Sequence, residues 1–179
     1  MALPATIHRV AIELSDVDQN RYASISTTAA RHPSETAERL IARLIAYALS
    51  YHEDIAFTRG ICEPDEPDLW IKSLDGRLLE WIEVGLPEAK RLVKAGNHCE
   101  QVTLFAYGSA FERWLAASKT QLAAMKNLRL FYLSDELIDP LVAQLNRSIN
   151  WQFTNSDKTL YITVGDESIV GDVVEIDLD

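Results

Sequence analysis

The segment from Asp68 to Gly85 constrains the fold more than any other part of the sequence. It reads DLWIKSLDGRLLEWIEVG, two runs of alternating apolar and polar residues separated by Asp75-Gly76. An Asp-Gly pair between two such runs is a strong signal for a β-hairpin with a two-residue loop. The sequence therefore predicts a hairpin in which Leu74 faces Arg77 across the loop.

Following this pairing outward, Trp70 faces Trp81 and Asp68 faces Glu83. Because side chains alternate along a strand, these four lie on one face of the hairpin. The Cβ atoms of directly opposed residues are about 4.5–5.5 Å apart, and like charges placed so are destabilising. Two carboxylates at that distance require a shared proton or a cation. Mg²⁺ binds one or two carboxylates together with water and substrate oxygens, so we predict a Mg²⁺ site with Asp68 and Glu83 as ligands.

Simpler interpretations of the same residues stay open. Asp68 follows Pro67 and can be a turn residue, and Glu83 can lie at a solvated sheet edge. A register slip of one residue would place the two acids on opposite faces. The paired tryptophans can stack on nucleic-acid bases, although packing against the sheet is the commoner role of such residues.

Hydrophobic periodicity and helix signals predict the remaining elements. Strands are expected over residues 5–14, 21–28, 101–107, 128–133, 149–155 and 158–164, with one more in the acidic tail. Helices are expected over residues 34–51 with Ser34 as N-cap, from Pro87 to about Ala95, over 109–125, and over 135–147 with a kink or early end at Pro140. Residues 52–67 are expected to be irregular, and a turn is expected at Ser156-Asp157. This order predicts an α/β fold with a mixed sheet, flanking helices and additional β-strands at both termini, in one domain spanning residues 1–179.

Charge and motifs exclude several classes of protein. The chain has 17 Lys and Arg against 27 Asp and Glu, a net charge of −10, which excludes a basic nucleic-acid-coating protein. The four histidines show no metal-ligand spacing, and no G-x-G-x-x-G, P-loop or G-x-S-x-G motif occurs. No signal peptide and no apolar run long enough for a membrane span is present. We therefore expect a soluble cytoplasmic protein without a membrane partner.

Lys90 is a candidate cation for the same site. Glu83 is followed by Val84-Gly85 and then by the helix expected from Pro87, whose first turns include Lys90. Ligands commonly bind at such strand-to-helix transitions in α/β proteins. A lysine reaching back toward Glu83 could stabilise phosphate charge or orient a metal-bound water. The alternative is an exposed lysine paired with Glu88.

Pro67-Asp68, the hairpin and Glu83 together resemble the PD-(D/E)xK nuclease-like superfamily. The resemblance implies a restriction-endonuclease-like fold, and it implies a lysine two residues after the second acid, where this chain has Gly85. In divergent members the lysine lies on the following helix, which Lys90 matches. The superfamily's preceding helix often contributes an acid, and Glu38 matches it better than Glu35 does.

The whole chain resembles the YaeQ family of small bacterial proteins. The resemblance is carried by MALPATIH, ARHPSETAERLIARLIAYAL, EPDEPDLW and EWIEVGLPEAKRLVKA. It implies a variant PD-(D/E)xK fold and leaves the biochemical activity open. The fold would bring basic residues of two helices near the site as a locally positive rim, with ordinary solvated helix faces as the alternative. The rim candidates are Arg31, Arg39, Arg43, Lys90, Arg91 and Lys94.

Two functional hypotheses follow. The first is a Mg²⁺-dependent phosphodiesterase or nuclease-like enzyme acting on nucleic acid or another phosphodiester, with Asp68 and Glu83 on the metal, Glu38 supporting them and Lys90 assisting water or phosphate. The second is a non-catalytic binding or regulatory protein with a nucleic-acid or protein partner. Gly85 at the motif lysine position and the acidic net charge, which disfavours long duplexes, motivate the second.

Overall fold

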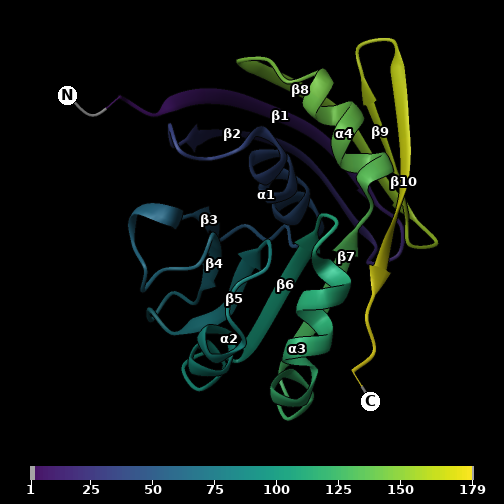
Figure 1. Ribbon diagram of the computed structural model, residues 1–179. Helices are drawn as coiled ribbons and strands as arrows, with labels where there is room; N and C mark the ends of the chain where they lie inside the picture. Colours follow the sequence, from purple (N-terminus) through teal and green to yellow (C-terminus); the bar gives the residue numbers. More distant parts are fainter. Residues whose placement is uncertain (1–2, 179) are drawn as a thin grey trace. The chain divides into compact units, whose positions relative to one another are not determined.

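The computed structural model describes residues 3–178, apart from the side chain of Cys62, and over this range it is a mixed α/β protein (Figure 1). Its contacts group the chain into two compact units. The first unit comprises Met1–Leu49 and Ser134–Val173, and the second comprises Ser50–Leu133 and Val174–Asp179. The mixed sheets and flanking helices expected from the sequence are present in both units, whereas the single domain stays a prediction.

The first unit contains five strands in the order β2-β1-β8-β9-β10. Their bounds are β1 Thr6–Asp16, β2 Arg21–Arg31, β8 Ser148–Ser156, β9 Thr159–Val164 and β10 Glu167–Glu175, the last two residues of β10 falling in the second unit. Strands β1 and β8 are parallel, and the other neighbours are antiparallel. Two helices complete the unit, α1 at Ala37–Leu49 and α4 at Asp135–Ala143.

Strand periodicity predicted the N-terminal hairpin correctly. His8, Val10, Ile12 and Leu14 are buried on one face of β1, and the residues between them are exposed. Such alternation is what a strand with one packed face requires.

The β8–β9 turn lies one residue later than expected, at Asp157-Lys158. Both residues have positive φ, 52° and 62°, as the central residues of a type I′ hairpin turn do. The carboxylate of Asp18 accepts hydrogen bonds from both of their backbone N–H groups, each at 2.8 Å. An acidic side chain from the β1–β2 turn therefore holds the β8–β9 turn.

Both helices of the first unit are shorter than predicted. Helix α1 begins at Ala37, because Thr36 Oγ1 rather than Ser34 accepts the backbone N–H of Arg39, at 3.2 Å. Ser34 instead pairs with the ring of His32. Helix α4 contains Pro140 and ends at Ala143. An early end was expected, because proline has no backbone N–H to donate and its ring clashes with the preceding turn of the helix.

Three arginines of the predicted basic rim converge on one buried acid, Glu35. Arg43 binds both carboxylate oxygens, with Nε 2.7 Å from Oε1 and an Nη 2.8 Å from Oε2. Arg39 binds Oε1 at 3.2 Å, and Arg31 donates to the backbone carbonyl. Arg43 is only 4% exposed. The prediction that Arg43 belongs to an exposed basic rim is therefore wrong, because its guanidinium forms a buried ion pair with Glu35.

Replacing Glu35 by Ala removes the carboxylate that neutralises the buried Arg43 guanidinium, which we expect to lower the free energy of unfolding by about 3 kcal/mol. Glu35→Ala combined with Arg43→Met should recover part of this loss, since no charge is then left buried. Urea denaturation measures both, with the exposed Glu53→Ala as control. A Glu35→Ala loss no larger than that of the control would contradict the prediction.

The second unit contains five strands in the order β7-β6-β5-β4-β3. Its elements are β3 Ile55–Phe57, a 3₁₀ turn at Gly60–Cys62, β4 Leu69–Lys72, β5 Leu78–Val84, α2 Ala89–Gly96, β6 Gln101–Tyr107, α3 Phe111–Ala123 and β7 Leu128–Leu133. Strands β5, β6 and β7 are parallel, whereas β3, β4 and β5 are antiparallel. Strands β6 and β7 have the predicted bounds, and the segment expected to be irregular contains β3.

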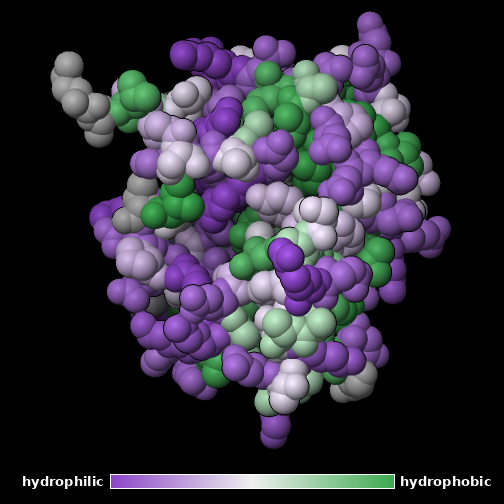
Figure 2. Space-filling model, in the orientation of Figure 1, coloured by the Kyte–Doolittle hydropathy of each residue, from purple (hydrophilic) through white to green (hydrophobic). Residues whose placement is uncertain are grey.

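Helices α2 and α3 cover the parallel part of this sheet (Figure 1). Their apolar residues pack on β6 and β7 in one cluster, made of Ala89, Leu92, Ala95, Val102, Leu104, Ala106, Phe111, Leu122 and Leu130. On the face shown in Figure 2, hydrophilic side chains predominate and hydrophobic ones form smaller groups. Among the described residues, no helix is long and apolar enough to cross a membrane.

Candidate metal site on the β4–β5 hairpin

The central pairing of the β4–β5 hairpin agrees with the sequence, but its turn does not. Trp70 pairs with Trp81, as predicted. The loop has three residues, 74–76, because Ser73 rather than Leu74 pairs with Arg77, the Ser73 N–H donating to the Arg77 carbonyl at 2.9 Å. Gly76 has φ +85°, the left-handed conformation typical of a three-residue loop with a bulge.

A second irregularity restores the predicted register. Lys72 pairs with Leu78, and Ile71 pairs with Glu80, so Leu79 is left unpaired as a bulge. A bulge adds one residue to one strand. The bulge and the longer loop compensate one another, and the pairs beyond Ile71 therefore match the register drawn for a two-residue loop.

Asp68 and Glu83 are both buried at the end of this hairpin, with exposures of 1% and 4%. The burial excludes a solvated sheet edge for Glu83. Asp68 Oδ2 accepts the backbone N–H of Val84 at 2.8 Å, which brings it to the Glu83 end of β5. Glu83 Oε1 accepts Trp81 Nε1 at 2.9 Å, as residues two apart on one strand face can do.

The environment raises the pKa of Glu83 to about 7. Burial is the main cause, because a desolvated carboxylate is disfavoured, and the charge of Asp68 adds to it. The positive charge of Arg91 and the hydrogen bonds from Arg91 and Trp81 act in the opposite direction. Burial and the Asp68 charge outweigh them, so near neutral pH the site binds a proton or favours a cation.

The cation beside the acids is Arg91, the neighbour of the predicted Lys90. Arg91 Nε donates to Glu83 Oε1 at 2.7 Å. The same guanidinium donates to the backbone carbonyls of Pro64 and Glu66, and it lies over the Trp81 ring, 5.6 Å from its centroid. These contacts fix the charge of Arg91 in place between helix α2 and the loop before β4.

Lys90 turns to solvent instead. Its Nζ lies 2.9 Å from Glu88 Oε2, and its side chain is 83% exposed. This is the pairing that the sequence left as the alternative. Lys90 still borders a hollow of about 610 Å³, whose walls also include Trp81, Arg91, Lys94 and His98.

Gly85 takes the motif lysine position and has φ +101°, a conformation that side-chain-bearing residues rarely adopt. Its N–H bonds to the Phe105 carbonyl at 2.9 Å, which ties the end of β5 to β6. A lysine at this position would strain the backbone where the strand ends. Any cation at this site therefore has to come from another element.

Glu38, the remaining candidate, lies half-buried on α1 in the first unit, whereas the other three candidates lie in the second. Its part in the site stays a prediction. Among the described residues, no group of three or more His, Cys, Asp or Glu side chains could hold a metal ion. The structure brings two of the predicted acids, Asp68 and Glu83, close enough to interact, and a metal ion bound by them stays a prediction.

The fold and the acid pair define a mixed α/β protein with a buried two-carboxylate site on a hairpin. The model of the family described as "YaeQ protein" matches residues 1–172. The chain is 37% identical to the uncharacterized protein YaeQ of Escherichia coli K12 over 164 residues, 91% of each chain. This chain belongs to the YaeQ family.

Two crystal structures of YaeQ proteins have the same fold. That from Pseudomonas syringae is 37% identical, with a TM-score of 0.93 over 98% of each chain. That from Xanthomonas axonopodis pv. citri is 32% identical, with a TM-score of 0.92 over 96% of this chain and 97% of the other. These likenesses confirm the family that the sequence resembled and establish no function.

The pKa of Glu83 predicts a pH dependence of stability. Its value in the folded chain, about 7, exceeds its ordinary value of 4.5. The contribution of Glu83 to the stability of the folded chain is therefore complete below pH 4.5 and is lost as the pH rises through 7. Glu83→Gln cannot ionise. Between pH 4.5 and 8, we expect the free energy of unfolding of Glu83→Gln to increase relative to that of the wild type by about 3 kcal/mol.

Urea denaturation of both proteins across this range measures that difference, and titrations elsewhere in the chain cancel in it. Glu88→Gln, a change at an exposed acid, is the matched control and should show little pH dependence relative to the wild type. The raised pKa would be contradicted if the difference in unfolding free energy between Glu83→Gln and the wild type did not change with pH, or changed so as to stabilise the wild type.

Proposed function

We propose that the chain is a metal-dependent phosphodiesterase of the PD-(D/E)xK, restriction-endonuclease-like kind, acting on nucleic acid or another phosphodiester. The buried acid pair Asp68 and Glu83 is the observation that carries the proposal. Two buried carboxylates close enough to repel one another need a positive charge nearby when both are ionised. Arg91 supplies one such charge, which leaves the three groups with a net charge of −1.

The donor set suits one Mg²⁺ ion. Glu83 Oε1 carries both hydrogen bonds of that side chain, and its Oε2 accepts none from the described residues. Mg²⁺ is commonly bound through one or two carboxylates and completes its shell with water and substrate oxygens. Bound there, the ion would polarise a phosphodiester and lower the pKa of its water.

The other residues have supporting roles in this proposal. Arg91 holds the Glu83 carboxylate and places a fixed positive charge where phosphate charge develops. Lys90 contributes an exposed ammonium to the wall of the hollow beside Trp81, where it contacts the phosphate of a bound strand. Glu38, on α1 of the first unit, is the candidate that the family resemblance gives for the superfamily's helical acid.

The first test is cation binding, with Mn²⁺ as the probe at pH 8, where Glu83 is ionised. Calorimetry should show one Mn²⁺ bound per chain, and Asp68→Asn with Glu83→Gln should abolish it. The control Glu88→Gln removes an exposed acid and should leave binding unchanged. Metal-dependent cleavage of single- and double-stranded DNA and RNA should fall at least about 100-fold in the double variant, a scale typical of losing essential catalytic groups. Unchanged cleavage would overturn the proposal.

The role of Lys90 has a separate test. If it contacts only the phosphate of the bound substrate, Lys90→Ala raises KM about fivefold and leaves kcat unchanged, since uniform binding is lost. Lys126→Ala, a change at an exposed lysine elsewhere in the second unit, is the control. A fall in kcat at constant KM would contradict the binding role and indicate direct assistance to the reaction.

A second candidate function, a non-catalytic binding or regulatory protein, is favoured by the Arg91–Glu83 ion pair. The guanidinium already neutralises Glu83, and neither Gly85 nor Lys90 brings a lysine to the acids. In that case Arg91 is a permanent replacement for a metal, and a nucleic-acid or protein partner binds without being changed. The binding role then predicts no Mn²⁺ uptake by the wild type and no cleavage of any substrate.

A further inference from the structure

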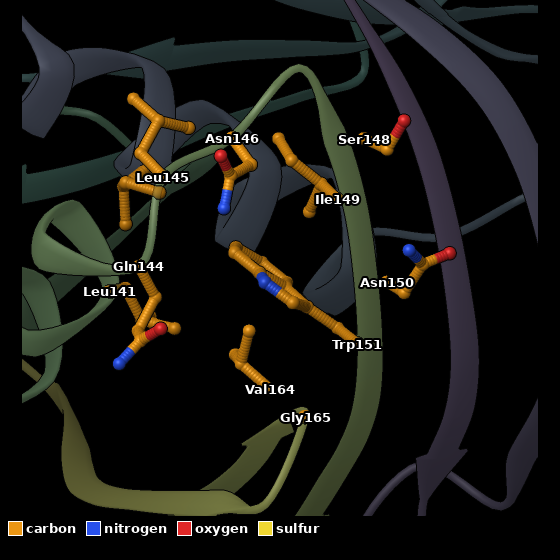
Figure 3. A pocket seen from close by; sticks show the side chains of 11 residues that line it. Leu141, Gln144, Leu145, Asn146, Ser148, Ile149, Asn150, Trp151, Val164 and Gly165 are labelled. Carbon is orange, nitrogen blue, oxygen red and sulfur yellow. The ribbon is translucent and has the colours of Figure 1, made fainter.

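A separate cavity of about 320 Å³ lies within the first unit (Figure 3). It is lined by strand β8, the β9–β10 turn, the end of α4 with the loop after it, and Ile41 of α1. Its volume is at the lower end of the range for small-ligand sites, about 300–1,000 Å³. It shares no residue with the acid pair, so what it binds does not depend on the function proposed above.

Trp151 supplies an unpaired hydrogen-bond donor to this cavity. The residue is 4% exposed, yet its indole Nε1–H has no hydrogen-bond partner among the described residues. By contrast, the Nε1–H of Trp81 donates to Glu83, and that of Trp114 donates to the Pro87 carbonyl. Figure 3 shows the Trp151 nitrogen facing the open space of the cavity. This nitrogen is not one of the fully buried unpaired atoms of the described residues, so it is reached from the cavity and is available to a ligand.

Asn146 supplies a second polar group. Its side-chain amide faces the same space (Figure 3) and forms no hydrogen bond with the described residues. Its backbone carbonyl accepts His8 Nδ1 at 2.8 Å, which fixes the loop independently of the amide. Gln144 is engaged, since its amide donates to Glu167, and the side chains of Ser148 and Asn150 point to the other side of β8 in Figure 3.

The rest of the lining limits the chemistry of the occupant. No Asp, Glu, Lys or Arg is among the lining residues, and aliphatic side chains from Ile41, Leu141, Leu145, Ile149 and Val164 form the walls. A charged ligand would lose its hydration without gaining a counter-charge. A sugar would bury several hydroxyls against two available polar groups, and a wholly apolar ligand would leave both of those groups unpaired.

We propose that this cavity binds a small neutral amide carried on a ring, such as a lactam or a pyrimidine base. The ligand carbonyl accepts Trp151 Nε1–H, the amide edge pairs with the side-chain amide of Asn146, and the ring contacts the aliphatic walls. An amide side chain offers a donor and an acceptor side by side, which is how Asn pairs with the edge of a base. The same chemistry is presented by a free base and by a base in a single strand.

The test is NMR of ¹⁵N-labelled full-length protein, in which the four tryptophans give four indole N–H signals. Uracil is the probe, with oligouridylate as a second arm and glucose as the polyol control. We expect a saturable shift of the Trp151 signal with uracil, assigned by its loss in Trp151→Phe, and none with glucose. Tighter binding of oligouridylate would identify a base within a strand as the source, and equal or weaker binding would identify the free molecule.

The matched variants are Asn146→Leu and Asn150→Leu, since both residues line the cavity but only the first directs its amide into it. Asn146→Leu should weaken uracil binding about tenfold, the loss of roughly one hydrogen bond, and Asn150→Leu should leave it unchanged. Asn146 is exposed and its backbone contact persists, so this variant stays informative if Trp151→Phe fails to fold. Absence of a saturable shift at the solubility limit of uracil, an equal loss in both Asn variants, or tighter binding of glucose would overturn the proposal.

Discussion

The repulsion between two buried carboxylates governs the arrangement of the second unit around its hairpin. Asp68 directly precedes β4, Glu83 lies on β5, and both side chains are buried. Isolated buried charges are costly, so the surroundings have to supply compensation. The Val84 N–H, the Trp81 indole and the Arg91 guanidinium each do so. In turn, the same guanidinium holds the backbone of the loop that carries Pro64 and Glu66.

The sequence was sufficient to predict the register of the outer hairpin pairs, because two departures from the simple hairpin cancel. Alternating apolar residues determine which face of each strand is buried, and that pattern fixed the pairing of Trp70 with Trp81. The three-residue loop and the bulge at Leu79 depend on local backbone energies of nearby turn types. Those energies differ too little to be read from residue identities, so the turn itself was predicted incorrectly.

Choosing between Lys90 and Arg91 was beyond the sequence for a different reason. Successive helical residues point about 100° apart, so an error of one or two residues in the start of a helix changes which side chain faces the strand. Helix α2 begins at Ala89 instead of Pro87. The cavity at Trp151 gave no sequence signal at all, because Asn146 lies in a loop and Trp151 fits an ordinary core position on an alternating strand.

The chain order of the two units has a consequence for synthesis. The second unit is nearly contiguous, whereas the first joins the two ends of the chain. Strand β1 gains β8 as its parallel neighbour only across a long separation, as in the buried bond between Asn155 and Asp16, 139 residues apart. A ribosome therefore releases β5, β6 and β7 with their helices well before β1 meets its second neighbour. During that interval the β1 edge of the N-terminal ribbon, which later pairs with β8, is uncovered, and such an edge invites pairing with other nascent chains.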